Sequence, residues 1–266
     1  MTDPKAPTKP DTITLRGIDI HAVTEAGCVD HIIHELDAKR GGWVITPNLD
    51  HMRRAETDPE FKDMLDQADL IVADGNPLVW ASRIQGTPLP ERVAGSSLVW
   101  SLAQAAAKAN RSLYLLGGDP GAADKAAEVL KKRYPNLNIV GTDCPPVGFD
   151  KQDDGISKVL EKVLEACPDI VYVGLGSPKQ ERLIRQIRIK LPHVWWLGVG
   201  ISLSFIAGDV RRAPQWVQKL GLEWLHRLFQ EPGRLAKRYL VHGLPFAARL
   251  LLGALFHKPH KHDRSE

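Results

Sequence analysis

Residues 70–80, Leu-Ile-Val-Ala-Asp-Gly-Asn-Pro-Leu-Val-Trp, decide the fold class of this 266-residue chain. Four apolar residues lead directly into Asp74 and Gly75, and Asn76 then opens a segment with helical apolar spacing. This order predicts a buried strand, a tight turn and the start of a helix. Ligands of parallel α/β sheets bind where strands end, so Asp74 is either a catalytic or ligand-binding carboxylate or the N-terminal cap of the following helix.

The same order of apolar strand, polar turn and helix recurs along most of the chain. Strands that alternate with helices of about 10–15 residues are typical of parallel βαβ units. We therefore expect an α/β fold, with a single Rossmann-like, mostly parallel sheet and helices on both faces. The predicted strands are residues 43–45, 70–73, 112–116, 138–142, 169–173 and 194–197.

Local signals refine the ends of several elements. Alternating apolar and polar residues predict a short hairpin over residues 12–23. Thr24 is the predicted N-terminal cap of the helix that follows. Ser96 or Ser97 is the predicted cap of an alanine-rich helix that runs to Asn110.

Two further polar residues follow the strand at residues 43–45. Thr46 and Asn48 share a sheet edge with Asp74 if their two strands are neighbours. They are therefore candidates for substrate binding. The alternative is that Thr46, which precedes a proline, is only a turn residue.

Glycines end two other predicted strands, and these turns are candidates for a nucleotide loop. Glycine lets backbone N–H groups approach a phosphate at the start of a helix. The signal is weak, because any tight turn between a strand and a helix can use glycine. The residues concerned are Gly117, Gly118, Gly174 and Gly176.

Charge divides the chain into parts. Residues 211–266 hold 11 Lys and Arg against 4 Asp and Glu, whereas the rest has 24 against 28. We expect a disordered lead at 1–11, an α/β core at 12–210 and a basic helical C-terminal appendage at 211–266. The basic appendage suggests an anionic partner such as nucleic acid, anionic lipid or a diphosphate.

The apolar segment at residues 239–256 has two interpretations. A central Arg249 and Pro245 make it a poor transmembrane span. Its flanking cations suit a helix that lies in a membrane interface. The alternative is a C-terminal helix that packs on the core.

Cysteine usage and the N-terminus bear on the compartment. Cys28, Cys144 and Cys167 are far apart and form no CxxC pair, so neither a disulfide framework nor a zinc site is expected. The polar, proline-rich first ten residues have no apolar signal core. These features favour a reducing, cytoplasmic compartment.

Several segments together resemble one family, the WecG/TagA/CpsF glycosyltransferases. The resemblance covers about residues 13 to 245, and the runs at residues 174–181 and 221–225 are each specific to it. The segments are Thr46-Pro47-Asn48, Ala73-Asp74-Gly75, Glu91-Arg92-Val93-Ala94-Gly95-Ser96, Gly174-Leu175-Gly176-Ser177-Pro178-Lys179-Gln180-Glu181, Arg212-Ala213-Pro214, Gly221-Leu222-Glu223-Trp224-Leu225-His226-Arg227-Leu228 and Gln230-Glu231-Pro232-Gly233-Arg234-Leu235.

The resemblance implies a membrane-associated, inverting transferase. Such an enzyme moves a sugar from a UDP-sugar donor to a polyprenyl-diphosphate-linked saccharide acceptor, in the biosynthesis of bacterial cell-surface polysaccharides. It implies a cytoplasmic protein held peripherally at the inner face of the cell membrane. The donor sugar stays open between N-acetylmannosamine, its uronic acid and glucose, and a homo-oligomer is possible.

The resemblance also implies roles for individual residues. Asp74 is expected to be the catalytic base and Thr46 to lie near the reacting sugar. The appendage is expected to close over the site and hold the diphosphate. The substrate-binding residues expected beside Thr46 and Asn48 are Gln180, Arg212, Arg227, Arg234 and either Lys237 or Arg238.

The chemistry of glycosyl transfer asks for the same parts. One carboxylate suffices as the base of an inverting transfer. The leaving diphosphate needs a metal, cationic side chains or helix N-termini. The sequence has no Asp-x-Asp pair for a divalent metal, so we expect no cofactor and arginine binding of the diphosphate.

One departure and three alternatives accompany this hypothesis. The family often has an acid where this chain has Ser97, which leaves the donor sugar in doubt. An NAD(P)-dependent oxidoreductase is the first alternative, although no GxGxxG opens the first βα unit. A non-catalytic, membrane-recruited nucleotide-binding protein is the second. A nucleic-acid binder is disfavoured, because the basic residues have no aromatic platform among them.

Overall fold

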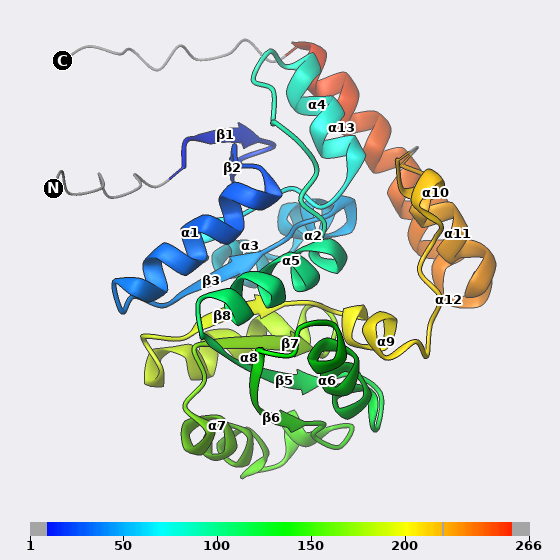
Figure 1. The fold of residues 1–266 in the computed structure, drawn as a ribbon. Coiled ribbons are helices and arrows are strands. Elements are labelled where there is room, and N and C mark those ends of the chain that lie inside the picture. Colours follow the sequence, from blue (N-terminus) through cyan, green and yellow to red (C-terminus); the bar gives the residue numbers. More distant parts are fainter. Residues whose placement is uncertain (1–9, 220, 257–266) are drawn as a thin grey trace, which may run out of the picture.

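A six-stranded parallel sheet forms the centre of the molecule in a computed structural model that describes residues 10–219 and 221–256 (Figure 1). The strand order is β4-β3-β8-β7-β5-β6, and every neighbouring pair is parallel. The α/β prediction is therefore confirmed. The strands are β3 (Gly42–Ile45), β4 (Leu70–Ile71), β5 (Ser112–Gly117), β6 (Asn138–Asp143), β7 (Ile170–Gly174) and β8 (Trp195–Gly198).

The predicted N-terminal hairpin is also present. Strands β1 (Thr12–Leu15) and β2 (Ile18–His21) pair antiparallel as a separate two-stranded sheet. The His21 ring accepts a hydrogen bond at Nδ1 from the backbone N–H of Ile71, 3.0 Å away, which ties the hairpin to the edge strand β4. Most of the expected disordered lead, residues 1–9, lies outside the described residues.

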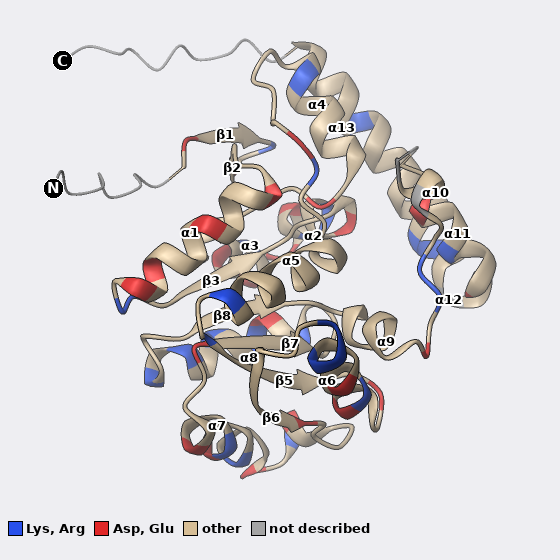
Figure 2. Cartoon of the chain, in the orientation of Figure 1, with Lys and Arg blue, Asp and Glu red and all other residues tan. Residues whose placement is uncertain are grey.

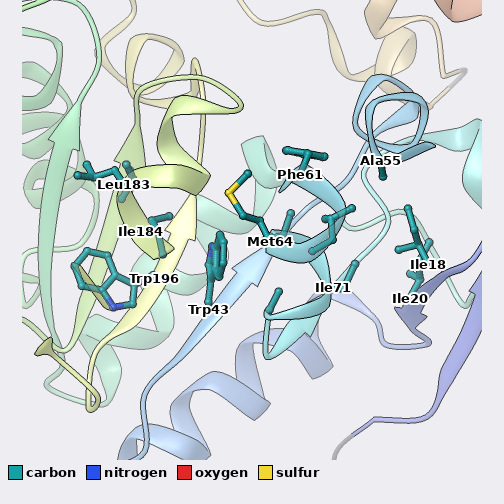
Figure 3. Packing of buried hydrophobic residues seen from close by; sticks show 14 of the residues in the cluster. Ile18, Ile20, Trp43, Ala55, Phe61, Met64, Ile71, Leu183, Ile184 and Trp196 are labelled. Carbon is teal, nitrogen blue, oxygen red and sulfur yellow. The ribbon is translucent and has the colours of Figure 1, made fainter. Parts of the chain in front are cut away.

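Helices cover both faces of the sheet, and each face has its own hydrophobic core. One core packs the sheet against α1 (Glu25–Asp37), α5 (Gly95–Lys108), α6 (Ala122–Arg133) and α9 (Ser202–Ala207). The other core lies under α2 (Leu49–Thr57), α3 (Pro59–Asp66), α4 (Asn76–Ile84), α7 (Gly155–Ala166), α8 (Lys179–Ile187) and α13 (Leu244–Phe256). Figure 3 shows this second core, where Trp43 and Trp196 of adjacent strands pack beside Met64 and Ile184.

Period-2 alternation of the strands directs Thr46 and Asp74 to the same face. Val44, Leu70 and Val72 belong to the core on the α5 side. Pairing of the two chains continues past the short strands, since the Asp74 N–H donates to the Pro47 carbonyl at 2.9 Å. Thr46 lies two positions after Val44, and Asp74 lies two positions after Val72. Their side chains therefore face α5 as well.

Helix starts agree with the prediction in one case and differ in another. Thr24 caps α1, and its hydroxyl accepts from the N–H of Gly27 at 3.0 Å. The predicted serine cap of α5 is wrong, because α5 already begins at Gly95 and Ala94 occupies the cap position. Among the described residues no side chain caps α4, so capping of that helix by Asp74 is wrong too.

The appendage is a series of short helices followed by a long one. Helices α10 (Gln215–Lys219), α11 (Glu223–Gln230) and α12 (Pro232–Ala236) lead into a π-helical turn (Lys237–Gly243) and α13. Chain direction breaks at Glu231, between α11 and α12, so the appendage arginines do not lie on one continuous helix. Two single-turn 3-10 helices complete the fold, Phe149–Lys151 and Arg188–Lys190.

Helix α13 packs alongside α4 by one face only (Figure 1). Phe246, Leu250 and Ala254 are buried against the core, whereas Leu252 and Leu255 are more than half exposed, at 55% and 62%. Lys237–Phe256 is a 20-residue helical run that is long and apolar enough, by length and composition, to cross a membrane. Helix α13 therefore combines a core-packing face with an exposed apolar face.

Candidate active site

The start of α5 is the point on which the candidate site converges. The loop before this helix is tied to the end of β4, because the N–H of Val93 donates to the Ala73 carbonyl at 2.9 Å. A Cβ atom on Gly95 would lie 3.0 Å from Thr46 Oγ1, so the hydroxyl of Thr46 contacts the first residue of α5. The backbone N–H of Gly95 also hydrogen-bonds to the carboxylate of Asp74. Thr46 and Asp74 therefore meet at one helix N-terminus.

The pKa of Asp74 is raised from 3.8 to about 6. Loss of hydration on burial is the main cause, and the nearby carboxylate of Glu223 raises the pKa further. Arg92, the Gly95 N–H and Arg212 oppose this shift. At neutral pH Asp74 is therefore ionised and is a stronger base than an ordinary carboxylate.

An arginine–glutamate–arginine cluster joins the appendage to this site. Glu223, the first residue of α11, receives Arg92 Nη1 on Oε2 at 3.3 Å and Arg212 Nε on Oε1 at 3.1 Å. The remaining N–H groups of Arg212 reach the start of α5, where Nη1 donates to the Ser96 carbonyl and Nη2 to Ser97 Oγ, both at 3.0 Å. The appendage is thus held across the end of β4.

A glycine allows the close approach of the appendage to α4. Gly221, between α10 and α11, has φ +74°, and a Cβ atom there would overlap Asn76 Nδ2 at the start of α4. Only glycine combines that backbone conformation with the absence of a side chain. The position of α11 beside the start of α4 therefore depends on Gly221.

Gln180 and Asn48 have structural roles at the same sheet edge. Gln180 is buried, and its Oε1 accepts from the N–H of Gly200 at 3.0 Å while its Nε2 donates to Glu181. Asn48 caps α2, because its Oδ1 accepts from the N–H groups of Asp50 and His51. Asn48 lies just beyond β3 and Gln180 lies in the first turn of α8, and both side-chain oxygens already accept backbone N–H groups.

The other predicted basic residues are spread over the appendage. Arg227 lies over the ring of Phe205 in α9, 5.9 Å from its centroid. Arg238 pairs with Asp50 at 3.2 Å, and Lys237 is exposed. The side chain of Arg234 lies outside the described part of the structure. The stretch from α11 to α13 as a whole holds more basic than acidic residues (Figure 2).

Packing accounts for three of the four candidate loop glycines. A Cβ on Gly117 would lie 2.8 Å from the carbonyl of Gly174, and one on Gly174 would meet Leu203 of α9. Gly118 has φ +85° and donates its N–H to the Gly174 carbonyl at 2.8 Å. Gly176 has φ +74° and open space around it. These turns thus let β5, β7 and α9 approach closely.

Arg92 and Glu223 are site residues that the sequence analysis did not single out. Both lie in segments that carry the family resemblance, and Glu223 is one of only four acids in the basic appendage. No local pattern distinguishes Glu223, because Glu231 is a second acid in the same basic segment. Within residues 10–219 and 221–256, no group of three or more His, Cys, Asp or Glu side chains suits a metal ion.

Comparison with known proteins gives the same assignment along most of the chain. The model of the glycosyl transferase WecG/TagA/CpsF family matches residues 13–260. Two similar relatives are both described as N-acetylglucosaminyldiphosphoundecaprenol N-acetyl-beta-D-mannosaminyltransferase. The one from Bacillus subtilis strain 168 is 32% identical over 201 residues, 76% of each chain. The one from Bacillus spizizenii is 31% identical over 199 residues, 75% of each chain.

Proposed function

Because this chain belongs to the WecG/TagA/CpsF family, it is a glycosyltransferase, and we propose that it moves a sugar from a UDP-sugar to a polyprenyl-diphosphate-linked saccharide with inversion. The observation that carries the proposal is the site at the start of α5. There a carboxylate of raised pKa lies beside two arginines that belong to different parts of the chain. A base and a diphosphate site are the two parts that this reaction needs.

Asp74 is the proposed base. Its carboxylate takes the proton of the acceptor hydroxyl as the hydroxyl oxygen attacks the anomeric carbon of the donor. The bond between that carbon and the phosphate oxygen breaks on the opposite face, and UDP leaves with the electron pair. A pKa of about 6 suits this step, because the group is ionised at neutral pH yet binds a proton better than an ordinary aspartate.

Cationic side chains are the proposed partners of the leaving diphosphate. Arg92 and Arg212 both act electrostatically on Asp74, and Arg227 lies one turn beyond Glu223 on α11. The planar guanidinium group binds phosphate oxygens in pairs, which stabilises the charge that develops on UDP without a metal. Thr46 is proposed to contact the reacting sugar. The other proposed substrate contacts are Asn48, Gln180, Arg234, Lys237 and Arg238.

The proposed substrates follow the names of the relatives. Those proteins are N-acetylmannosaminyltransferases that act on N-acetylglucosaminyldiphosphoundecaprenol. We take UDP-N-acetylmannosamine as the first donor to test, with its uronic acid and UDP-glucose as the competing donors. The first acceptor to test is a polyprenyl diphosphate that carries N-acetylglucosamine.

The inner face of the cell membrane is the proposed location, with the chain bound peripherally. The exposed apolar residues of α4, the π-helical turn and α13 support it, and these elements adjoin in the fold. Exposed cations on the same elements, Arg83, Lys237 and Arg249, suit anionic lipid head groups. The apolar residues are Trp80, Ile84, Leu240, Leu244, Leu252 and Leu255.

A direct assay tests the function. The full chain is incubated with each UDP-sugar and a short-chain polyprenyl-diphosphate-N-acetylglucosamine, and the lipid product is weighed by mass spectrometry. Asp74→Asn is expected to lower turnover by about 100-fold or more, whereas Asp66→Asn on the exposed face of α3 is expected to leave turnover unchanged. Absence of product with every UDP-sugar, or full activity of Asp74→Asn, contradicts the proposal.

A further inference from the structure

The Glu223 carboxylate bridges two arginines with one oxygen for each. Its Oε1 and Oε2 lie 3.1 Å from Arg212 and 3.3 Å from Arg92. The three side chains are only 16% to 20% exposed, so the ion pairs are weakly screened by solvent. A phosphate group bridges two arginines in the same way, with separate oxygens on separate guanidinium groups.

The Glu223 bridge neutralises positive charge beside Asp74. Four charged groups act on one another there: two arginines and the carboxylates of Asp74 and Glu223. Their sum is zero when both carboxylates are ionised. The diphosphate of a nucleotide sugar carries two negative charges, and it gains little from a cluster whose cations are already neutralised. The charge balance therefore favours diphosphate binding to these arginines when Glu223 leaves them.

We propose that Glu223 is an internal stand-in for the donor diphosphate, which holds Arg92 and Arg212 in the donor-free enzyme and is displaced when the nucleotide sugar binds. The inference rests on the proposed function, because it takes a nucleoside diphosphate as the ligand. Glu223 is thus a positioning residue. It keeps the arginines aligned at the start of α5 until a phosphate replaces its carboxylate.

The helix that carries Glu223 also carries the next cation. Arg227 lies four residues further along α11, on the same face as Glu223. Its guanidinium packs over Phe205 rather than joining the cluster. A shift of α11 along its axis that withdraws Glu223 can therefore bring Arg227 toward the diphosphate. The exchange replaces a negative charge by a positive one at the moment of binding.

The sign of a change in affinity separates this role from a purely structural one. If Glu223 competes with the diphosphate, Glu223→Gln is expected to bind UDP about tenfold more tightly, which corresponds to ~1.4 kcal/mol. If Glu223 only fastens the appendage to the core, the same variant binds UDP more weakly. In an Arg212→Ala background the gain from Glu223→Gln is expected to shrink to less than about threefold.

Isothermal titration of the full chain with UDP, without acceptor, is the test. Glu56→Gln, which breaks the ion pair with Arg16 on the hairpin, is the matched control and is expected to bind UDP as the wild type does. If Glu223→Gln does not fold, Glu223→Asp replaces it. Its carboxylate is one methylene shorter and holds the two arginines less closely, so a smaller gain in affinity is expected.

Each outcome decides between the two proposals. Tighter UDP binding by the Glu223 variant supports the stand-in role. Unchanged or weaker binding, with wild-type binding intact, overturns the stand-in role and leaves the proposed function standing. If neither protein binds UDP, the proposed donor itself is wrong, and the stand-in role is overturned with it.

Discussion

Replacing Asp74 by asparagine is expected to stabilise the folded protein at neutral pH while it removes transferase activity. The pKa of Asp74 is raised from 3.8 to about 6 in the folded state, mainly by burial. Between these two pH values the unfolded chain has released the proton and the folded chain still holds it. The free energy of unfolding therefore falls as pH rises from about 4 to 6, and the loss is complete above pH 6.

The size of the effect follows from the pKa difference. A shift of about two units corresponds to ~3 kcal/mol, at 1.36 kcal/mol for each unit. Asp74 keeps partial exposure to solvent, which makes this an upper bound. We therefore expect Asp74→Asn to be more stable than the wild type by about 1–3 kcal/mol at pH 7.5 and by no more than about 0.5 kcal/mol at pH 4. Asparagine keeps a side-chain oxygen for the Gly95 N–H, so the helix start is retained.

Urea denaturation followed by tryptophan fluorescence measures the difference at pH 7.5, 5.5 and 4. Asp66→Asn serves as the control, because it removes a carboxylate from an exposed ion pair with Lys62 and is expected to change stability by less than about 0.5 kcal/mol. A stability difference between Asp74→Asn and wild type that is the same at all three pH values refutes the reasoning. So does a loss of stability at pH 7.5.

Three further predictions follow from the same contacts. The wild-type kcat/KM is expected to rise tenfold per pH unit below about pH 6 and to level off above that pH. A kcat/KM that stays constant between pH 5 and 7 would contradict a base of raised pKa at Asp74. Gly221→Ala is expected to lower turnover at least about tenfold, because the added methyl group displaces the appendage from α4. Gly233→Ala is the control and should leave the rate unchanged, because a Cβ there meets open space. Trp80→Ser should reduce co-sedimentation with anionic lipid vesicles by several-fold, while Val147→Ser, in an exposed loop of the core, should sediment like the wild type.

Much of the sheet and part of the site could be predicted from local patterns. Apolar runs predicted the six strands, and the polar residues that follow two of them placed Thr46 and Asp74 at one sheet edge on the condition that these strands are neighbours. The sequence did not predict that β3 and β4 are neighbours, because sequence order does not determine the order of strands in a sheet. The six-residue helix α9 was not predicted, because Ser-Leu-Ser-Phe-Ile-Ala is too short to show a helical period.

The missed features depend on contacts between distant parts of the chain. The start of α5 was misplaced because a serine cap is a local signal, whereas the carboxylate bound to the Gly95 N–H belongs to Asp74, 21 residues earlier. Arg92 and Glu223 are 131 residues apart, and neither stands out by itself. Charged residues on a helix are usually solvated, so a sequence pattern does not single out those that face one another across a fold.

The cations of the site have two effects, because they neutralise the charge of the diphosphate and they also lower the pKa of Asp74. A base gains strength as its pKa rises, but a base whose pKa lies above the working pH is already protonated and cannot accept a proton. Burial and Glu223 raise the pKa of Asp74, whereas Arg92 and Arg212 lower it. When a diphosphate replaces Glu223, one anion is exchanged for another of larger charge, and the pKa of Asp74 is driven further upward. On the proposed mechanism the arginines compensate two phosphate charges and still leave Asp74 ionised, so we expect Arg227 of α11 to act as a third cation.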